Sequence, residues 1–216
     1  LTALEDPTEF NLATPLDDES ITLESRNGKQ WSPQNYDKQF RGQVPLLQGL
    51  TESLSIPTVN LGMQVGLDAL ADTVERLGVT TPLEQVPSLT LGAVELTPFV
   101  TNQMYQTLSN NGRYVPLHTV TSVVTAENNL LWQKAEFYSQ RADEAATYLL
   151  NYALYKVTTE GTAKRLGANF GSVNMAGKTG TTGDYRDSWF SGFDRNNVGT
   201  VWVGNVDNQS IYLTGI

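Results

Sequence analysis

The sequence predicts an α+β fold in which helices pack on an antiparallel sheet, with further helices forming a helical subdomain. Apolar residues recur at helical spacing over much of residues 44–157, which predicts several amphipathic helices. Residues 187–194 and 198–206 are instead β-rich runs, joined by the short segment 195–197. Because these hairpin-linked strands follow the helices and do not alternate with them, an antiparallel sheet is favoured over a repeated βαβ unit.

Composition is that of an ordinary globular chain and excludes several kinds of site. The 216 residues suffice for one sizeable core, and the formal net charge of −9 argues against a nucleic-acid partner. The chain has no cysteine, which excludes disulfides and thiolate ligands, and its only histidine is His118. A histidine-based metal site is therefore excluded, and His118, in a strand-like segment without a nucleophile motif, is interpreted as structural. We expect no metal and no cofactor.

Both ends of the sequence are typical of a fragment. It opens Leu-Thr-Ala-Leu without methionine, as the end of a helix would, and it closes soon after a strand. No apolar run approaches the roughly 18 residues that cross a bilayer. We therefore expect residues 1–216 to be a single partial domain that is incomplete at both ends.

The first quarter of the chain predicts loops, a hairpin and a helix–helix connection. The acidic segment 1–24, which contains two prolines, is expected to be a solvated surface loop, and Asn27-Gly28 predicts a tight turn between residues 21–25 and 29–31. A short helix ending near Ser53 is indicated by the apolar residues Val44, Leu46, Leu47, Leu50 and Leu54.

Pro57 predicts a break near Ile56 and then a new helix that runs to about Val65. Ser53 therefore falls in the connection between two helices, where its hydroxyl can point into a cleft. A serine in such a place more often caps a helix, and the local sequence favours capping.

Three further helices and a second hairpin are predicted downstream. The helices span 67–77 with Gly78 at the end, Thr97-Pro98 to Gly112, and Asp143 to about Val157. The third carries Tyr148, Tyr152 and Tyr155, which we expect in the core. Residues 119–125 and 130–133 are expected to pair as a hairpin. A short turn or helix follows at 161–166.

The stretch Met-Ala-Gly-Lys-Thr-Gly-Thr-Thr at residues 175–182 concentrates polar residues on a predicted strand. A phosphate-binding loop fails here because Ser172 stands where that pattern needs glycine, and β-rich sequence follows instead of a helix. Lys178-Thr179-Gly180 instead matches the K-T-G element of serine acyltransferases that bind penicillin. A strand lysine can hold a substrate carboxylate, glycine permits close approach of a substrate backbone, and threonine hydroxyls and strand N–H groups supply donors.

The whole chain resembles the transpeptidase domain of class A (bifunctional) penicillin-binding proteins, most closely the 1B type of Gram-negative bacteria. The segments run in the family's order and cover nearly the full length. They are Asn27-Gly28-Lys29-Gln30-Trp31-Ser32-Pro33-Gln34-Asn35, Ile56-Pro57-Thr58-Val59-Asn60-Leu61-Gly62, Leu91-Gly92-Ala93, Glu95-Leu96-Thr97-Pro98, and Ala176-Gly177-Lys178-Thr179-Gly180-Thr181-Thr182 with Trp189-Phe190-Ser191-Gly192.

The resemblance implies a peptidoglycan DD-transpeptidase that forms a serine acyl-enzyme with the D-Ala-D-Ala end of stem peptides and is trapped by β-lactams. In that scheme Ser53 and Lys178 are catalytic: Ser53 passes a proton to the leaving group and Lys178 orients it. Thr179 and Thr182 hold the substrate carboxylate, beside Gly180, and the Thr181 backbone N–H completes an oxyanion hole. Also implied are an upstream glycosyltransferase domain and membrane anchor, a place on the periplasmic side of the inner membrane, and outer-membrane activator and cell-division partners.

The sequence departs from the family pattern in two places, and only the second, at Ser55, favours an alternative function. The sequence contains no Ser-x-x-Lys, the motif of the nucleophile, so we expect these residues alone to be inactive. Ser55 stands where the S-x-N motif has asparagine, and a hydroxyl cannot present the donor and acceptor of an amide together. The alternative is a non-catalytic homologue that binds peptidoglycan or partner proteins. A β-lactamase or β-lactam sensor is disfavoured by residues 31–35 and 56–60, which resemble the synthase branch.

Overall fold

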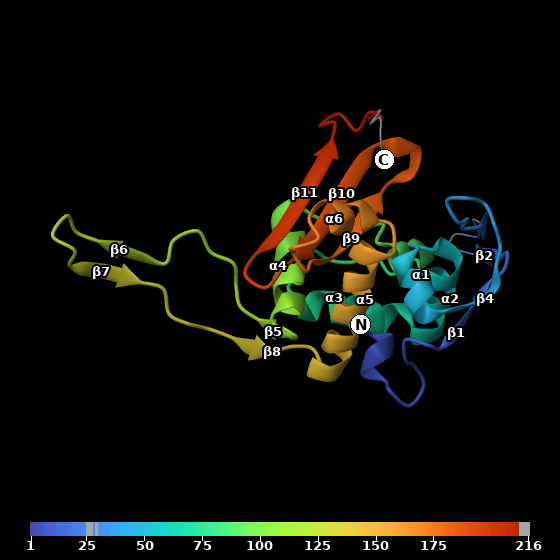
Figure 1. The fold of residues 1–216 in the computed structure, drawn as a ribbon, viewed down its shortest axis with the longest axis horizontal. Coiled ribbons are helices and arrows are strands. Elements are labelled where there is room, and N and C mark those ends of the chain that lie inside the picture. The colour runs from blue at the N-terminus through green and yellow to red at the C-terminus, as the bar shows by residue number, and fades with distance from the viewer. Residues whose placement is uncertain (25–27, 29, 212–216) are drawn as a thin grey trace.

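A three-stranded antiparallel sheet forms one side of the molecule, with helices packed against it (Figure 1). Its central strand β10 (Asp187–Phe193) pairs with β9 (Ala176–Thr181) on one edge and β11 (Val198–Gly204) on the other. Helix α4 (Pro98–Ser109) contacts β10 and β11, and α5 (Glu144–Thr159) contacts β9. The predicted α+β class, the antiparallel sheet and the strand at the Lys-Thr-Gly stretch are confirmed.

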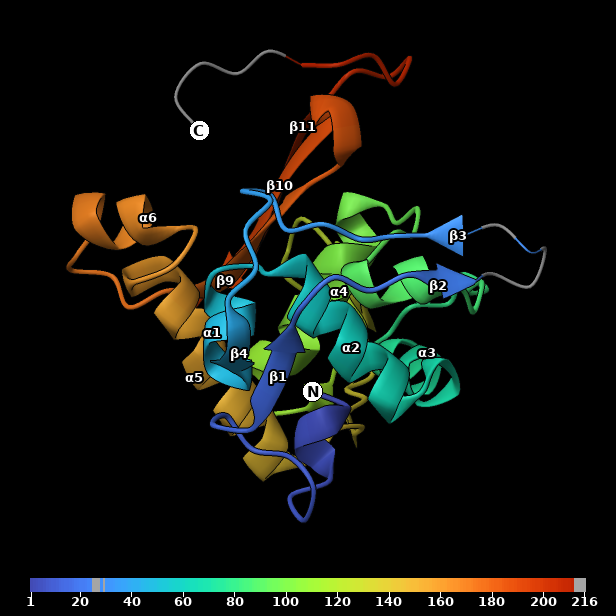
Figure 2. The same ribbon diagram turned by 90° about the vertical axis from the view of Figure 1, so that its right-hand side faces the viewer.

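This computed structural model describes residues 1–24, 28 and 30–211. The other strands and helices are β1 (Pro15–Asp18), β2 (Leu23–Glu24), β3 (Gln30–Trp31), β4 (Gly42–Pro45), α1 (Leu46–Thr51), α2 (Ser55–Val65), α3 (Leu67–Arg76), β5 (Arg113–Tyr114), β6 (Ser122–Val124), β7 (Leu130–Gln133), β8 (Ser139–Gln140) and α6 (Lys164–Asn169). Short 3-10 helices occupy Ala3–Glu5, Pro87–Leu91 and Gly183–Tyr185. Figure 2 shows α1, α2 and α3 grouped near β1 and β4, which is the helical part of the fold.

Two helices start where the sequence predicts. The Thr97 hydroxyl accepts the Val100 N–H at 3.3 Å at the start of α4, and Pro98 takes the first helical position. The Asp143 carboxylate accepts the Ala146 N–H at 2.8 Å at the start of α5. Both bonds satisfy N–H groups that have no partner within the helix.

Two clusters of buried apolar residues belong to the core. The first core cluster joins α3, α4, α5 and β9 through Leu77, Leu108, Ala142, Leu154 and Ala176. The second core cluster joins β1, β4 and the α1–α2 region through Leu16, Val44, Leu46 and Leu54. Val44 therefore lies in a strand and not in the predicted helix, which begins only at Leu46.

Residues 1–24 differ from the predicted surface loop. Leu4, Phe10 and Leu16 are buried, and the Asp18 side chain is 0% exposed. Strand β1 pairs with β4, so alternate residues of an acidic segment face the protein interior. The sequence did not predict this strand, because the prolines and carboxylates of this segment are typical of a loop. Four residues are also too few to show an alternating pattern.

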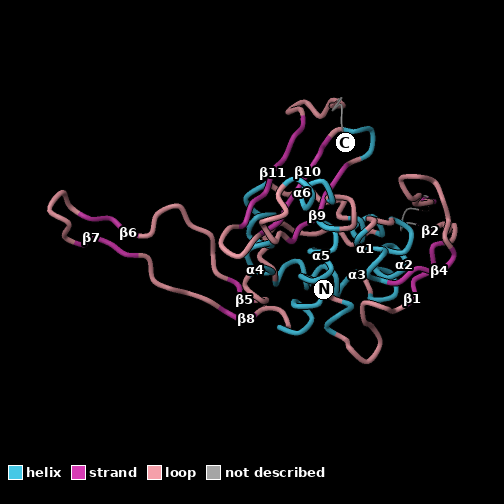
Figure 3. The backbone as a smooth tube through the Cα atoms, viewed as in Figure 1, coloured by secondary structure: helices cyan, strands magenta, loops and turns pink. Residues whose placement is uncertain are grey.

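Both predicted hairpins are present. Strand β2 pairs with β3, and Gly28 in the turn between them has a φ of +76°; Asn27 lies outside the described residues. Strand β6 pairs with β7, and this hairpin extends away from the rest of the molecule (Figure 3). His118 is exposed on the chain leading to β6, where its Nδ1 lies 3.1 Å from the Pro116 carbonyl oxygen.

The aromatic residues of α5 are less buried than expected. Tyr148 and Tyr152 are 68% and 43% exposed, so placing them in the core was wrong. Leu154 and Val157 supply the buried stripe of this helix, and Tyr155 packs at its margin. None of the helices in the described ranges has both the length and the apolar character needed to cross a bilayer.

Candidate active site

Strand β9 brings Lys178 against the connection between α1 and α2. The Lys178 ammonium donates a hydrogen bond to Ser53 Oγ at 2.8 Å and another to the Thr179 carbonyl oxygen at 3.1 Å. The two side chains are 125 residues apart in sequence. Tertiary structure therefore unites the serine and the lysine that the sequence assigned to separate motifs.

Ser53 has an unusual backbone conformation for a serine. Its φ of +57° lies in the left-handed region, which costs a residue with a Cβ roughly 1–2 kcal/mol. The turn is closed by hydrogen bonds from Ser53 N to Leu50 O at 3.2 Å and from Leu54 N to Gly49 O at 2.8 Å. Helix α2 is capped by Leu54 without a side-chain bond, so capping by Ser53, which the local sequence favoured, is wrong. The Ser53 side chain is exposed and accepts from Lys178 instead.

The environment of Lys178 makes its amine easier to deprotonate. Burial disfavours the charged form and lowers the pKa of Lys178 from 10.5 to about 8. Among the ion pairs between described residues, none involves this lysine. The lowered pKa brings the amine closer to neutral pH, where such a group can both give and take a proton.

The two threonine hydroxyls predicted to bind a carboxylate have protein partners in this structure. Thr179 Oγ1 lies 2.7 Å from Thr162 Oγ1, on the loop before α6. Thr182 Oγ1 donates to Asp187 Oδ2 at 2.9 Å and accepts the Asp187 N–H at 2.9 Å. Asp187 is held in turn by the Trp202 Nε1–H at 2.8 Å. A carboxylate bound by Thr182 must therefore compete with Asp187.

Gly180 and Thr181 complete the end of β9. A Cβ at Gly180 would lie 3.2 Å from the Cβ of its cross-strand partner Trp189, so close packing of the two strands already favours glycine. Thr181 is exposed at the last position of the strand. Ser55 is half-buried at the first position of α2, and the described hydrogen bonds do not link its side chain to Lys178.

Sequence reasoning missed residues that contact the segments next to this site. The buried amide of Asn35 accepts the Ile56 N–H at 3.2 Å, close to Ser53, from a segment without helix or strand. The phenol oxygens of Tyr36 and Tyr185 lie 3.0 Å apart, joining the chain after β3 to the segment after β9. Only the presence of Asn35 within a segment that carries the family resemblance could have drawn attention to it.

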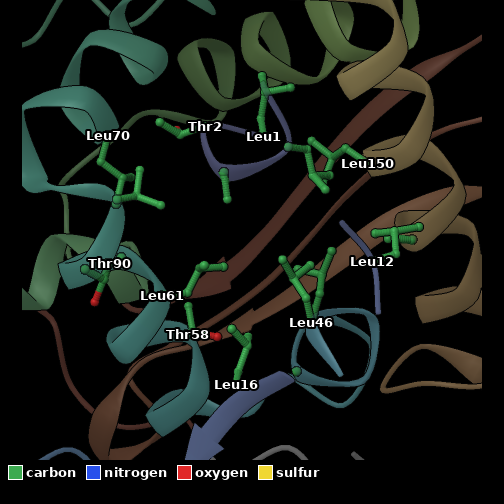
Figure 4. Close-up of a pocket in the computed structure, with 17 residues that line it drawn as sticks. Leu1, Thr2, Leu12, Leu16, Leu46, Thr58, Leu61, Leu70, Thr90 and Leu150 are labelled. Atoms are coloured by element: carbon green, nitrogen blue, oxygen red, sulfur yellow. The ribbon is translucent and has the colours of Figure 1, made fainter. Parts of the chain in front are cut away.

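An apolar cavity of about 190 Å³ lies apart from these residues (Figure 4). Leucine side chains converge on it from several elements, among them Leu16 of β1, Leu46 of α1 and Leu61 of α2. Threonines supply the polar side chains of its lining. None of the predicted site residues lines it.

Within the described ranges, no group of three or more His, Asp or Glu residues could hold a metal ion.

Comparison with known proteins gives a consistent result. A family model described as the penicillin binding protein transpeptidase domain matches residues 10–215. Penicillin-binding protein 1B of Vibrio cholerae is 47% identical over 216 residues, which is 100% of this chain and 28% of that protein. The chain thus spans little more than a quarter of the length of this relative.

Solved structures share the fold. Penicillin-binding protein 1A from Haemophilus influenzae superposes with a TM-score of 0.87 at 23% identity, over 96% of this chain and 36% of that one. PonA1 from Mycobacterium tuberculosis, solved in complex with penicillin V, gives a TM-score of 0.80 at 21% identity, over 98% of this chain and 59% of that one. At these identities the likeness concerns the fold alone.

Proposed function

This chain belongs to the transpeptidase-domain family of penicillin-binding proteins, and from that premise we propose that it forms one wall of the active site of a peptidoglycan DD-transpeptidase. The observation that carries the proposal is the 2.8 Å hydrogen bond from Lys178 Nζ to Ser53 Oγ. It joins a half-buried lysine with a lowered pKa to an exposed serine, and such a pair can relay a proton.

In the proposed reaction a serine outside residues 1–216 attacks the carbonyl carbon of the penultimate D-alanine of a stem peptide. The attacking oxygen gives its proton to a base outside residues 1–216 as the C–O bond forms. The C–N bond to the terminal D-alanine then breaks, and Ser53 donates a proton to the departing amine. An amine of a neighbouring stem peptide then attacks the acyl carbon and loses a proton as the new amide bond forms. The ester C–O bond breaks, and the serine oxygen takes up a proton.

Lys178 has two roles in this proposal. By donating to Ser53 Oγ it leaves the serine proton free to point toward the leaving group, and by exchanging a proton it can recharge Ser53 after each turnover. In its charged form it attracts the terminal carboxylate of the donor peptide. Thr179 and Thr182 assist with that carboxylate, which for Thr182 requires displacement from Asp187.

The remaining residues of the wall complete the substrate site. We assign the oxyanion contact to the backbone N–H of Thr181, and we assign the close approach of the substrate backbone to Gly180. Ser55 supplies a hydroxyl where an amide is usual. The solved complex of PonA1 with penicillin V supports β-lactams as ligands of the assembled site here.

The alternative function is a non-catalytic module that binds peptidoglycan or partner proteins. One observation favours it: Ser55 stands where the S-x-N motif has asparagine. In either function we propose a place on the periplasmic side of the bacterial inner membrane. A glycosyltransferase domain and membrane anchor on the same polypeptide, and outer-membrane activator and cell-division partners, are part of the same proposal.

A fluorescent penicillin tests the enzyme against the binding module. The complete gene product that contains these residues should be labelled covalently, and Lys178→Ala should slow labelling by about 100-fold or more, since one charged hydrogen-bonding group in a catalytic site is worth several kcal/mol. Lys164→Ala, at an exposed lysine of α6, serves as the matched control and should label normally. A folded wild-type protein that takes no label at saturating reagent would favour the non-catalytic module.

A further inference from the structure

The amide of Asn35 ties the start of α2 to the chain between β3 and β4. Asn35 is 2% exposed, and its Oδ1 accepts the Ile56 N–H at 3.2 Å. Its Nδ2 donates to Asp18 Oδ1 at 2.6 Å and to the Gln39 carbonyl oxygen at 2.9 Å. Both donors and the acceptor of this side chain are thus in use within the interior.

Asp18 and Arg41 continue the network to the other side of Ser53. The second carboxylate oxygen of Asp18 accepts the Arg41 backbone N–H at 3.2 Å and the Arg41 Nη1–H at 3.5 Å. The Arg41 guanidinium also lies 3.7 Å from the carboxylate of Glu52, the residue immediately before Ser53. The network therefore contacts the chain at Glu52 and at Ile56.

The turn between these contacts needs support from elsewhere. Ser53 is held at a φ of +57°, and the first turn of α2 has no cap from its own N-terminal side chain. The Ile56 N–H is one of the groups that a helix start leaves unpaired, and Asn35 supplies its acceptor from a distant segment. A strained conformation persists only where surrounding contacts determine it, and the contacts at Glu52 and Ile56 add to the backbone bonds that close the turn.

We infer that Asn35 is a positioning residue for Ser53: its buried amide, fixed by Asp18, holds the turn that presents the Ser53 hydroxyl to Lys178. This inference rests on the proposed function for its catalytic consequence. The role requires an amide, because the side chain must donate to Asp18 and accept from Ile56 at once. Aspartate at this position has the same size but sets a second carboxylate against Asp18.

The first test compares acylation rates in the complete gene product with a fluorescent penicillin. Asn35→Ala and Asn35→Asp should each slow acylation by about 10- to 100-fold, the loss expected from misplacing a catalytic group by about 1 Å. Adding Asp18→Asn to Asn35→Asp should restore part of the rate, because the carboxylate at position 35 still cannot donate to the Gln39 carbonyl oxygen. In that pair the amide at position 18 can donate to the carboxylate at 35 and still accept from the Arg41 N–H.

A double-mutant cycle separates positioning of Ser53 from general destabilisation. If Asn35 acts through Ser53, then Asn35→Ala should change acylation by no more than about twofold when Ser53→Ala is already present. The matched control is Asn151→Ala, which removes another partly buried asparagine whose Nδ2 donates to the Leu108 carbonyl oxygen at 2.9 Å. This control should leave the acylation rate unchanged in both backgrounds.

Hydrogen exchange followed by mass spectrometry gives a readout that does not depend on catalysis. Asn35→Ala should raise exchange in the peptide that covers the first turn of α2, and Asn151→Ala should not. If wild type is never acylated but this exchange rises, the proposed function fails and the positioning of the turn stands. Equal acylation rates for wild type and Asn35→Ala, unchanged exchange, or an equal loss in the Ser53→Ala background would each overturn the inference.

Discussion

Lys178, to which we assign a catalytic role, lies in surroundings that disfavour its charged form. Its amine is half-buried, and burial lowers its pKa from 10.5 to about 8. The hydrogen bonds to Ser53 Oγ and the Thr179 carbonyl oxygen hold it in place without supplying a compensating negative charge. The charged form therefore costs stability near neutral pH, as is common for groups whose function requires proton exchange.

This cost should appear as a pH dependence of stability. Because the folded-state pKa lies below the unfolded one, the unfolded protein binds more protons between about pH 8 and pH 10.5, and the wild type gains stability over that window. Measured against Lys178→Met, the unfolding free energy of wild type should rise by about 2–3 kcal/mol from pH 7 to pH 10.5.

Thermal or urea unfolding at several pH values provides this measurement. The exposed Lys164→Met should show no comparable trend relative to wild type. A flat difference between wild type and Lys178→Met over the same range would mean that the Lys178 amine is solvated and that its lowered pKa is wrong.

Residue types and motifs identified the candidate site residues, but their partners came only from the fold. Lys178 belongs to a short motif that can be recognised locally, whereas Ser53 was identified only through the family resemblance, because its local sequence favoured capping. Asp187 follows Thr182 closely, yet their mutual hydrogen bonds depend on how β9 turns into β10. The contact from Asn35 to Ile56 joins segments 21 residues apart whose meeting no local pattern predicts.

At the scale of elements, helix boundaries were predictable where a cap marks them. Thr97 and Asp143 begin helices as expected, and Gly78 follows α3 with a φ of +118°. Prediction failed where polar residues are buried or aromatic residues are exposed. Strand β1 buries an acidic residue, and the face of α5 that carries Tyr148 is exposed despite its aromatic character.

The α5 cap gives a test at this scale. Asp143→Ala should lower the free energy of unfolding by about 1 kcal/mol, because the Ala146 N–H loses its acceptor and the helix N-terminus loses a favourable negative charge. Asp143→Asn keeps an acceptor in place, so its loss of unfolding free energy should be no more than about half as large. Urea denaturation of the three proteins measures the differences, and equal stabilities would show that the cap contributes nothing.

At the scale of the whole molecule, the first core cluster connects the helices to the sheet. Leu154 of α5 is 3% exposed and belongs to this cluster together with Ala176 of β9. Leu154→Ala should therefore lower the free energy of unfolding by about 2–5 kcal/mol through lost burial and the cavity it leaves. Denaturant titration with circular dichroism measures the loss.

Tyr148→Ala, on the same helix at a position that is 68% exposed, is the matched control. It should change stability by no more than about 0.5 kcal/mol. Comparable losses for the two variants would mean that the orientation of α5 on the sheet differs from the one described.

The placement of Ser53 and Lys178 relative to the two core clusters has a practical consequence. Ser53 directly precedes Leu54 of the second core cluster, and Lys178 lies two residues after Ala176 of the first. The hydrogen bond between them therefore depends on how the two core clusters are placed relative to each other. A slight shift of one cluster relative to the other should lengthen that bond before secondary structure is lost. Heat inactivation should thus precede melting, and a preparation can retain its full circular dichroism signal after it has ceased to react.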